Sequence, residues 1–461
     1  MKPRIGLSMI VKNAARDLPR CLESARGVAD EMILADTGST DDTISIAQAA
    51  GAHVVSIPWE NDFAKARNLA LEALRARTSV DWVLMLDADE MLDSYAARDI
   101  APLVRDEEFA GYTVPIRNYF RSRNTRIWDC AAVENDGRLP AASEFPAFVA
   151  HGNVRLFRSD PEIHFVARVH ESVGPRIVEL GRKVRQCDLI VHHFGSAADR
   201  ETLARKNEFY RQLGKQKVLD MPENAQAHFE LGLLEFDNFH NYEAALASFI
   251  RACELSPRLA VAWLFLALTE LRLKKYDGAM AALQKCERLG YQLPLLAETR
   301  GDILYNTGQF RDASRAYERA LRKSPGSAAL ESKLGLALVR SGRKDRGIPL
   351  LREAPVKQPE LTDLHDRLVQ AWVWLEKLPA AAEASEQKLD TCPVLTPQDF
   401  LRAASIRAKL GETARAISVA ERGLAIFAEF PRLKTLLSEL QVIQNKSVIE
   451  LGSRPPAGVI R

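Results

Sequence analysis

The chain is long enough for about three average domains, and its positive and negative charges nearly cancel. It has 461 residues, with 63 Lys and Arg against 61 Asp and Glu, so the formal net charge of +2 argues against bulk attraction to nucleic acid or an anionic membrane. The six cysteines form no CxxC pair or zinc-spaced cluster, and neither a membrane span nor a signal peptide is recognisable, so we expect a cytoplasmic protein.

Up to about residue 200, short apolar runs alternate with helical stretches. Strands are predicted at residues 5–11, 31–35, 53–57 and 82–86, and helices at residues 18–26, 40–50 and 63–76. This alternation is typical of βαβ crossovers, so residues 1–200 are predicted to form a Rossmann-like α/β domain with a mostly parallel sheet. Ligands of such sheets bind at the carboxyl ends of the strands.

The second half of the chain reads as helix only. A polar helical connector is predicted over residues 201–221. Beyond it, prolines recur at intervals of 31 to 38 residues, at Pro222, Pro257, Pro294, Pro325, Pro359, Pro393 and Pro431. A period near 34 with small residues at fixed offsets indicates tetratricopeptide repeats, so residues 222–431 are predicted to form an all-α solenoid of about six units. Residues 432–461 are predicted to be a capping helix and a flexible tail.

Three acids follow the strand in "WVLMLDADE". Asp87, Asp89 and Glu90 repel one another, and buried carboxylates need a cation or strong donors, so we expect positive charge beside them. Asp87 and Asp89 are spaced to share one divalent ion, Mg²⁺ or Mn²⁺, which would neutralise a departing diphosphate. The alternative is that they are ordinary turn residues.

Two further motifs lie between these strands. In "ILADTGSTDDT", Asp36 ends a strand where it could accept hydrogen bonds from ribose hydroxyls, and Ser39 or Thr40 could cap the next helix. In "WENDFAKARNLAL", Arg67 lies within a helix among apolar neighbours, so its partner is either a structural carboxylate such as Asp62 or a ligand base.

Taken in order, these stretches resemble the family 2 glycosyltransferases, which have the GT-A fold, and most closely the bacterial members in which tetratricopeptide repeats follow. The matching stretches are "LSMIVKNAARDLPRCLESA", "EMILADTGSTDDT", "WENDFAKARNLAL", "WVLMLDADE", "VRLFRS" and "RVHESV". They cover most of residues 4–92 and then 153–173. Several motifs that agree in order and spacing are more specific than any one of them.

The resemblance implies roles for the donor-binding residues. The backbone around Met9 and Val11, together with Asp36, would hold the base and ribose of a nucleotide sugar. Arg67 would contact the base or the ribose edge. Asp87 would lie near the ribose and the metal, and Asp89 would coordinate the metal directly.

The resemblance also implies a general base, because family members invert the anomeric centre and must deprotonate the acceptor. Glu171 of "RVHESV" is the candidate, with His170 either orienting it or buried in the core. The alternative is that Glu171 forms a structural ion pair with an arginine: Arg155, Arg158 or Arg168.

The segment "IVHHFG" offers a third metal ligand. His192 and His193 point in opposite directions if the segment is a strand, so at most one of them serves, and His193 is favoured.

Residues 117–150 depart from the stretches that we can match to the family. They are aromatic and basic, and they could form an acceptor-binding insertion or a lid in which Arg121, Arg123 and Arg126 meet phosphate. Glu134 and Asp136 in the same segment are second candidates for the base.

The leading hypothesis is a metal-dependent inverting glycosyltransferase that uses a nucleoside diphosphate sugar, with uridine the family's common nucleotide. The repeats would present a peptide, protein or glycan acceptor, bind a protein partner, or dimerise the enzyme. An acceptor made at the membrane face is the rival to a soluble one. The alternative function is an inactive transferase domain attached to a protein-binding scaffold. The sequence argues against a dehydrogenase, because no GxGxxG follows the first strand.

Overall fold

The computed structural model describes residues 2–121, 126–127, 130–194, 200–291 and 293–452. The chain divides into two compact units, Met1–Ala262 and Trp263–Arg461. None of the described helices is long and apolar enough to cross a membrane.

The first unit begins with the predicted parallel sheet. Its strands are β1 (Ile5–Val11), β2 (Glu31–Asp36), β3 (His53–Ser56) and β4 (Trp82–Met85), and they lie in the order β3-β2-β1-β4 with every pair parallel. The crossover helices are α1 (Leu18–Ala25), α2 (Thr43–Ala49) and α3 (Phe63–Arg77). Apolar side chains cover both faces of this sheet, which explains the unbroken apolar runs of its strands. The α/β fold class is confirmed.

The remaining strands make the sheet mixed. The long strand β10 (Ala147–Arg158) runs antiparallel to β4 on one side and to β6 (Gly111–Phe120) on the other. Next come β12 (Val191–His193), parallel to β6, and β5 (Glu90–Leu92), antiparallel to β12. The parallel arrangement expected from the sequence therefore describes the first four strands, and antiparallel pairs build the other half. As a result, β5 and β12 lie at the same edge of the sheet as the carboxyl end of β4.

Short elements complete the α/β part. They are α4 (Ala96–Leu103), β7 (Arg126–Ile127), β8 (Cys130–Ala131), β9 (Val133–Glu134), a 3₁₀ turn (Pro140–Ala142), α5 (Gly174–Glu179) and β11 (Val184–Gln186). β7 and β8 pair only with each other, whereas β9 and β11 extend the main sheet.

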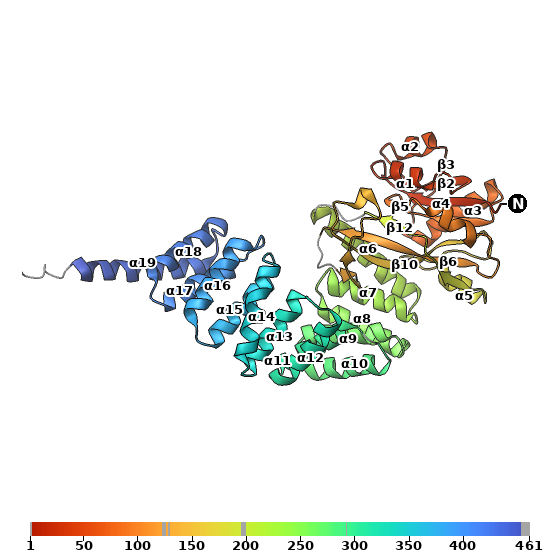
Figure 1. The fold of residues 1–461 in the computed structure, drawn as a ribbon. Coiled ribbons are helices and arrows are strands. Elements are labelled where there is room, and N and C mark those ends of the chain that lie inside the picture. Colours follow the sequence, from red (N-terminus) through yellow and green to blue (C-terminus); the bar gives the residue numbers. More distant parts are fainter. Residues whose placement is uncertain (1, 122–125, 128–129, 195–199, 292, 453–461) are drawn as a thin grey trace, which may run out of the picture. The chain divides into compact units, whose positions relative to one another are not determined.

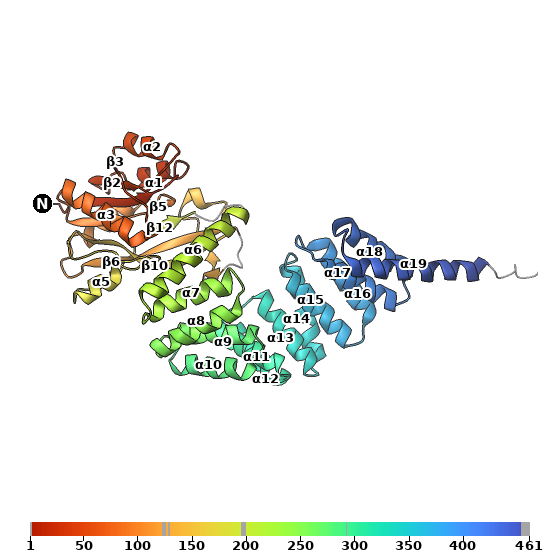
Figure 2. The ribbon, with the colours of Figure 1, turned by 180° about the vertical axis from the view of Figure 1, so that it is seen from behind.

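The first unit also contains three helices that follow the sheet: α6 (Arg200–Asp220), α7 (Ala225–Asp237) and α8 (Tyr242–Leu255). α6 is the helix predicted as a connector, and it lies between the sheet and α7 in both views (Figures 1 and 2). The helix that we predicted to be a connector is therefore part of the first unit.

Helix pairs fill the rest of the described chain. They are α9 (Ala260–Arg272), α10 (Tyr276–Arg288), α11 (Pro294–Asn306), α12 (Phe310–Lys323), α13 (Ala328–Arg340), α14 (Lys344–Lys357), α15 (Thr362–Trp374), α16 (Leu378–Thr391), α17 (Pro397–Lys409) and α18 (Thr413–Ile426), followed by α19 (Pro431–Gly452). With α7 and α8 they make six consecutive pairs among the described residues. A Cβ on Gly301 would lie 2.5 Å from the ring of Tyr317, so the glycine is what admits this ring between α11 and α12. The all-α solenoid is confirmed.

Candidate active site

A cavity of about 790 Å³ opens at the carboxyl ends of the parallel strands. Strands β1, β4, β10 and β12, helices α3 and α6, and the loop before α5 all contribute to its wall. Its lining includes Trp59, Arg67, Asp87, Asp89, Glu171 and His193. Because this edge is where open α/β sheets bind their ligands, the cavity is the candidate active site.

Two buried arginines compensate the acids that follow β4. Arg67 and Arg155 are each 5% exposed. Nη2 of Arg67 donates to Oδ1 of Asp87 at 2.7 Å, and Nη2 of Arg155 donates to Oδ2 of Asp87 at 3.0 Å and to Oε1 of Glu90 at 2.6 Å. Guanidinium groups therefore supply positive charge of the kind that the sequence led us to expect beside these acids.

The carboxyl groups of Asp87 and Glu90 have pKa values shifted in opposite directions. Burial opposes ionisation of Asp87, but Arg67 and Arg155 outweigh it and hold the pKa of Asp87 well below its usual range. Burial raises the pKa of Glu90 to about 7, Arg155 opposes this rise, and the charge of Asp87 adds to it. Asp87 is therefore the carboxylate that stays charged at neutral pH.

Asp89 and His193 meet at the cavity wall. Oδ2 of Asp89 lies 3.1 Å from Nε2 of His193, and Nδ1 of His193 lies 2.7 Å from Oδ1 of Asn118. Since the amide oxygen accepts a hydrogen bond, Nδ1 carries a proton, and neutral His193 turns the lone pair of Nε2 toward Asp89. Burial lowers the pKa of His193, but Asp89, Glu90 and Asp87 outweigh it and raise the pKa. A proton or a metal cation between the two groups satisfies both.

This donor set fits a divalent cation that also takes substrate oxygens. A carboxylate and an imidazole converge, and Asn118 fixes the second ring nitrogen of His193, which is how histidine ligands are oriented in metal sites. Among the described residues no third His, Cys, Asp or Glu completes a cluster around them. Mg²⁺ commonly uses one or two protein ligands plus substrate phosphates, so two ligands are consistent with such an ion.

The Glu171 side chain also turns into the cavity. Nε of Arg67 donates to Oε1 of Glu171 at 2.6 Å, so the partner of Glu171 is Arg67 and not Arg155, Arg158 or Arg168. One guanidinium group thus joins Glu171 to Asp87.

The loop that carries Glu171 has a strained backbone. An antiparallel bridge between Val166 and Ser172 closes it. Within it, Ala167 has φ of 73° and His170 has φ of 53°, in the left-handed region that costs roughly 1–2 kcal/mol for a residue with a Cβ. His170 is exposed and lines the cavity beside Glu171. Such strain persists only where neighbouring structure holds it.

Several residues singled out in the sequence lie outside the cavity wall. Asp36 is 3% exposed, and its carboxylate accepts from the backbone N–H groups of Gly38 and Ser39. Met9 is buried in the core, whereas Val11 lines the cavity. His192 is fully buried, with Nε2 3.3 Å from Asp93, so His193 is the histidine that the structure places beside Asp89.

Two local expectations are wrong. α2 begins at Thr43, and its N-cap position is Asp42 rather than Ser39 or Thr40, because Ser39 instead accepts from the backbone of Asn13. Arg67 does pair with carboxylates of the chain, but these are Asp87 and Glu171 and not Asp62. Asp62 caps α3 by accepting from the Lys65 backbone N–H at 2.9 Å.

The segment 117–150 contributes no lining residue to this cavity among its described residues. Arg121 pairs with Glu144 at 2.8 Å, and Asp136 accepts two hydrogen bonds from Arg117 at 2.8 and 2.9 Å. Glu134 lies in β9, which pairs with β10. Arg123 and the side chain of Arg126 lie outside the described part of the chain.

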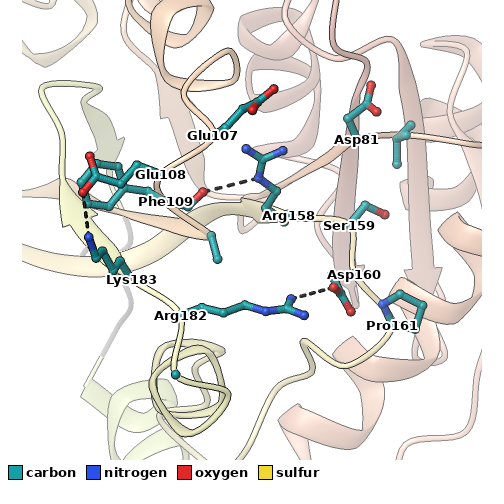
Figure 3. A pocket seen from close by; sticks show the side chains of 13 residues that line it. Asp81, Glu107, Glu108, Phe109, Arg158, Ser159, Asp160, Pro161, Arg182 and Lys183 are labelled. Carbon is teal, nitrogen blue, oxygen red and sulfur yellow. Dashed lines mark hydrogen bonds and ion pairs between the residues drawn. The ribbon is translucent and has the colours of Figure 1, made fainter.

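A second cavity, of about 700 Å³, lies at the opposite edge of the sheet, where β4 begins and β10 ends. Figure 3 shows two ion pairs in its lining: Arg182 with Asp160 at 2.6 Å, and Lys183 with Glu108 at 2.8 Å. Arg158 is held by backbone carbonyls. Because its arginine and lysine groups are already bonded and no quoted motif other than the end of "VRLFRS" reaches it, we place the chemistry in the first cavity.

The sequence did not single out the aromatic wall of the first cavity. Trp59 packs edge-on against Phe63, with ring centroids 4.9 Å apart, and Phe63 stacks on Tyr210 of α6 at 6.1 Å. Phe209 of α6 lies 6.3 Å from Trp59. Trp59 and Phe63 stand in a motif quoted above, but the α6 residues carry no local signal and reach the site only through the fold.

Comparison with known proteins gives a family match for each half of the chain. Residues 7–162 match the model of glycosyl transferase family 2, and residues 225–337 match that of a tetratricopeptide repeat-like domain. A TPR repeat-containing protein of Synechococcus elongatus is 30% identical over 295 residues, which are 61% of this chain and 66% of that protein.

Two further relatives are named as glycosyltransferases. The SPbeta prophage-derived glycosyltransferase SunS of Bacillus subtilis is 26% identical over 37% of this chain and 34% of its own length. An uncharacterized glycosyltransferase of Rickettsia felis is 38% identical over 19% of this chain and 30% of its own length. The chain therefore spans less than two thirds of each of these relatives. It carries a domain of glycosyl transferase family 2 followed by a tetratricopeptide repeat-like domain.

Proposed function

We propose that the protein is a glycosyltransferase that moves a hexose from a nucleoside diphosphate donor, uridine being the first nucleotide to test, to a peptide, protein or glycan acceptor. The observation that carries the proposal is the convergence of Asp89, His193 and Glu171 on one cavity at the strand ends. The alternative, an inactive domain on a binding scaffold, gives no reason for these groups to meet there.

The donor side of the cavity is assigned to the strand ends. Asp89 and His193 would hold Mg²⁺ or Mn²⁺, which supplies charge neutralisation of the leaving diphosphate when bound. Asp87 is held ionised and oriented by Arg67 and Arg155 near the ribose. Val11 would contact the nucleotide through its backbone. Asp36 and Met9 would act indirectly, by shaping the turn and the strand beneath it.

Glu171 is assigned as the general base. Its ion pair with Arg67 uses Oε1, so Oε2 can take the proton of an acceptor hydroxyl or thiol as the acceptor attacks the anomeric carbon. Attack from the side opposite the leaving diphosphate inverts that carbon. His170, beside Glu171 at the cavity wall, would contact the acceptor.

The repeats are assigned to acceptor or partner binding, because stacked helix pairs of this kind provide extended surfaces for peptides and proteins. Dimerisation through the repeats and an acceptor at the membrane face are further possibilities within the same proposal. No role in nucleic-acid binding is assigned.

The test is a melting-temperature measurement on the folded full chain with a panel of nucleoside diphosphates, with and without Mn²⁺. A ligand at 100 times its Kd stabilises the folded state by about 2.7 kcal/mol, so one nucleotide should raise Tm in a metal-dependent way. Asp89→Ala and His193→Ala should abolish that rise.

Asp136→Ala is the control, because this acid is paired with Arg117 away from the cavity. The Asp136→Ala variant should show the same nucleotide-dependent rise in Tm as the wild type. If it loses turnover, Asp136 replaces Glu171 as the candidate base. A folded wild-type protein that responds to no nucleotide or metal would contradict the proposal and favour the scaffold alternative.

A further inference from the structure

The loop that carries Glu171 is attached to helices α6 and α7. Lys217 of α6 is 4% exposed, and its Nζ donates to the carbonyl oxygen of Val169 at 2.9 Å. The same Nζ donates to Oε2 of Glu230, on α7, at 2.7 Å. A buried ammonium group is thus fixed on one side by a carboxylate and on the other by the backbone two residues before Glu171.

Arg168 provides a second attachment of the same loop. Its Nε donates to Oδ2 of Asp220, the last residue of α6, at 2.9 Å, and its Nη1 donates to the carbonyl oxygen of Asn61 at 3.0 Å. The carbonyl oxygen of Arg168 accepts from the backbone N–H of Phe63 at 2.9 Å. The loop is therefore held between the start of α3 and the end of α6.

These attachments flank the two strained residues. Ala167 and His170 have left-handed backbones, and the contacts of Arg168 and Val169 lie between them. A loop that contains two unfavourable conformations relaxes when its supports are removed. The position of Glu171 thus depends on groups that α6 and α7 supply.

We propose that Lys217 is a positioning residue for Glu171, so that the first repeat helix and the helix before it form part of the transferase centre. This inference rests on the proposed function, because it concerns how the assigned base is held. Both α6 and α7 lie beyond residues 7–162, the part that matches the transferase family.

The cavities support the same assignment. α6 supplies Lys206, Phe209 and Tyr210 to the wall of the candidate active site. A small adjoining cavity of about 100 Å³ is lined by Val169 and His170 on the loop and by Lys217 and Glu230 on the helices. The space around the base is thus bounded on one side by the sheet and on the other by α6 and α7.

The first test is amide hydrogen exchange on the full chain, followed by mass spectrometry. Lys217→Met removes the charge and the donor while keeping a side chain of similar length. We expect faster exchange confined to residues 164–173. Lys215→Met is the matched control, because Lys215 lies on the same helix but is exposed, and it should exchange as the wild type does. An unchanged rate in Lys217→Met overturns the inference.

The second test is turnover of the donor that the melting panel identifies, measured as release of nucleoside diphosphate. Misplacing a catalytic group by about 1 Å can cost roughly 100-fold in rate, so Lys217→Met should lower kcat by that order. The Kd for the nucleotide and the binding stoichiometry should not change, which separates positioning from partial unfolding. Glu230→Gln keeps an acceptor for Lys217 and should lose much less.

The outcomes separate this inference from the proposed function. Wild-type kcat in Lys217→Met overturns the positioning role even if exchange changes. If the wild type binds no nucleotide and turns over no donor, the proposed function fails, and the exchange result alone then decides whether Lys217 holds the loop.

Discussion

At the scale of single residues, the charged network after β4 determines which substitutions the site can accept without losing stability. Arg155 serves two carboxylates at once, Asp87 at 3.0 Å and Glu90 at 2.6 Å, and both Arg155 and Glu90 are buried. Desolvated charges of this kind are costly to leave alone, so the network is fragile to the loss of any one member even where its net contribution is small.

The first prediction follows from that asymmetry. Arg155→Met should lower the free energy of unfolding by about 1–3 kcal/mol, because it removes the donor that Asp87 and the buried Glu90 share. Urea unfolding followed by circular dichroism measures this loss. Adding Glu90→Gln should recover part of it. Arg98→Met, which removes an exposed pair with Asp99, is the control and should change little. Equal losses in both single variants would refute the argument.

A second residue-scale prediction concerns pH and the repeats. His365 of α15 is fully buried, its Nε2 donates to the carbonyl oxygen of Pro359 at 3.0 Å, and its Nδ1 has no partner among the described residues. Burial lowers the pKa of His365, a rise from the Pro359 hydrogen bond opposes this, and the charge of Lys388 lowers it further.

The direction of the pH dependence of stability follows from which state of the chain binds the proton. The unfolded chain takes up a proton at this histidine near pH 6.5, where the folded chain does not, so stability is full above that pH and falls as the pH drops below it. His365→Leu should flatten the dependence between pH 7 and pH 5. Urea unfolding at both pH values tests this, with a comparison at pH 8 to separate the packing effect. A dependence as steep as in the wild type would exclude His365 as its source.

At the scale of elements, the sequence predicts one half of the sheet much better than the other. The parallel half was predictable because each strand is a short apolar run followed by its own helix, a local signal. The antiparallel half was not, because β6 and β10 pair across about 25 intervening residues whose polar and aromatic pattern has no clear period. Only strand pairing in space places Arg155 beside the acids that follow β4.

The helix pairs permit a matched test of glycine. Gly301→Ala should destabilise the repeats by about 1–3 kcal/mol, because the new methyl group would meet the Tyr317 ring. Gly214→Ala on α6 is the control, since its nearest neighbour would be Leu231 at 3.5 Å, and it should instead stabilise its helix by up to about 1 kcal/mol. Thermal unfolding of both variants tests this prediction. A change of stability in the same direction in both variants would contradict the packing argument.

At the scale of the whole molecule, the boundary of the first unit lies beyond the sheet. Helices α6 to α8 group with the α/β part, and the unit ends at Ala262. The aromatic contacts of Trp59 and Phe63 with α6 show why, since removing that helix would expose both rings.

The corresponding prediction compares two fragments. Residues 1–258 should fold and bind the nucleotide with the affinity of the full chain, whereas residues 1–194 should aggregate or bind it much more weakly. The shorter fragment loses the contacts of the loop with Lys217 and Asp220 of α6 and exposes an apolar surface. Size-exclusion chromatography and nucleotide titration measure this. Equal behaviour of the two fragments would show that α6 to α8 are dispensable.

The sequence by itself determined the local features of this protein. Apolar period and proline spacing were enough for the parallel strands, the crossover helices and the repeats, and the order of the motifs was enough for the family. The residue types of Asp87 and Asp89 and their place after a strand also mark them as candidate site acids, and the resemblance to the family adds Glu171.

The tertiary structure decided which group each acid meets. Glu171 pairs with Arg67, 104 residues away, His193 rather than His192 faces Asp89, and Lys217 reaches the loop from a helix beyond the sheet. The carboxylate of Asp36 accepts from the backbone of its own turn. Periodicity fixes the face on which a side chain lies. The partner depends on distances between segments that only the folded chain brings together.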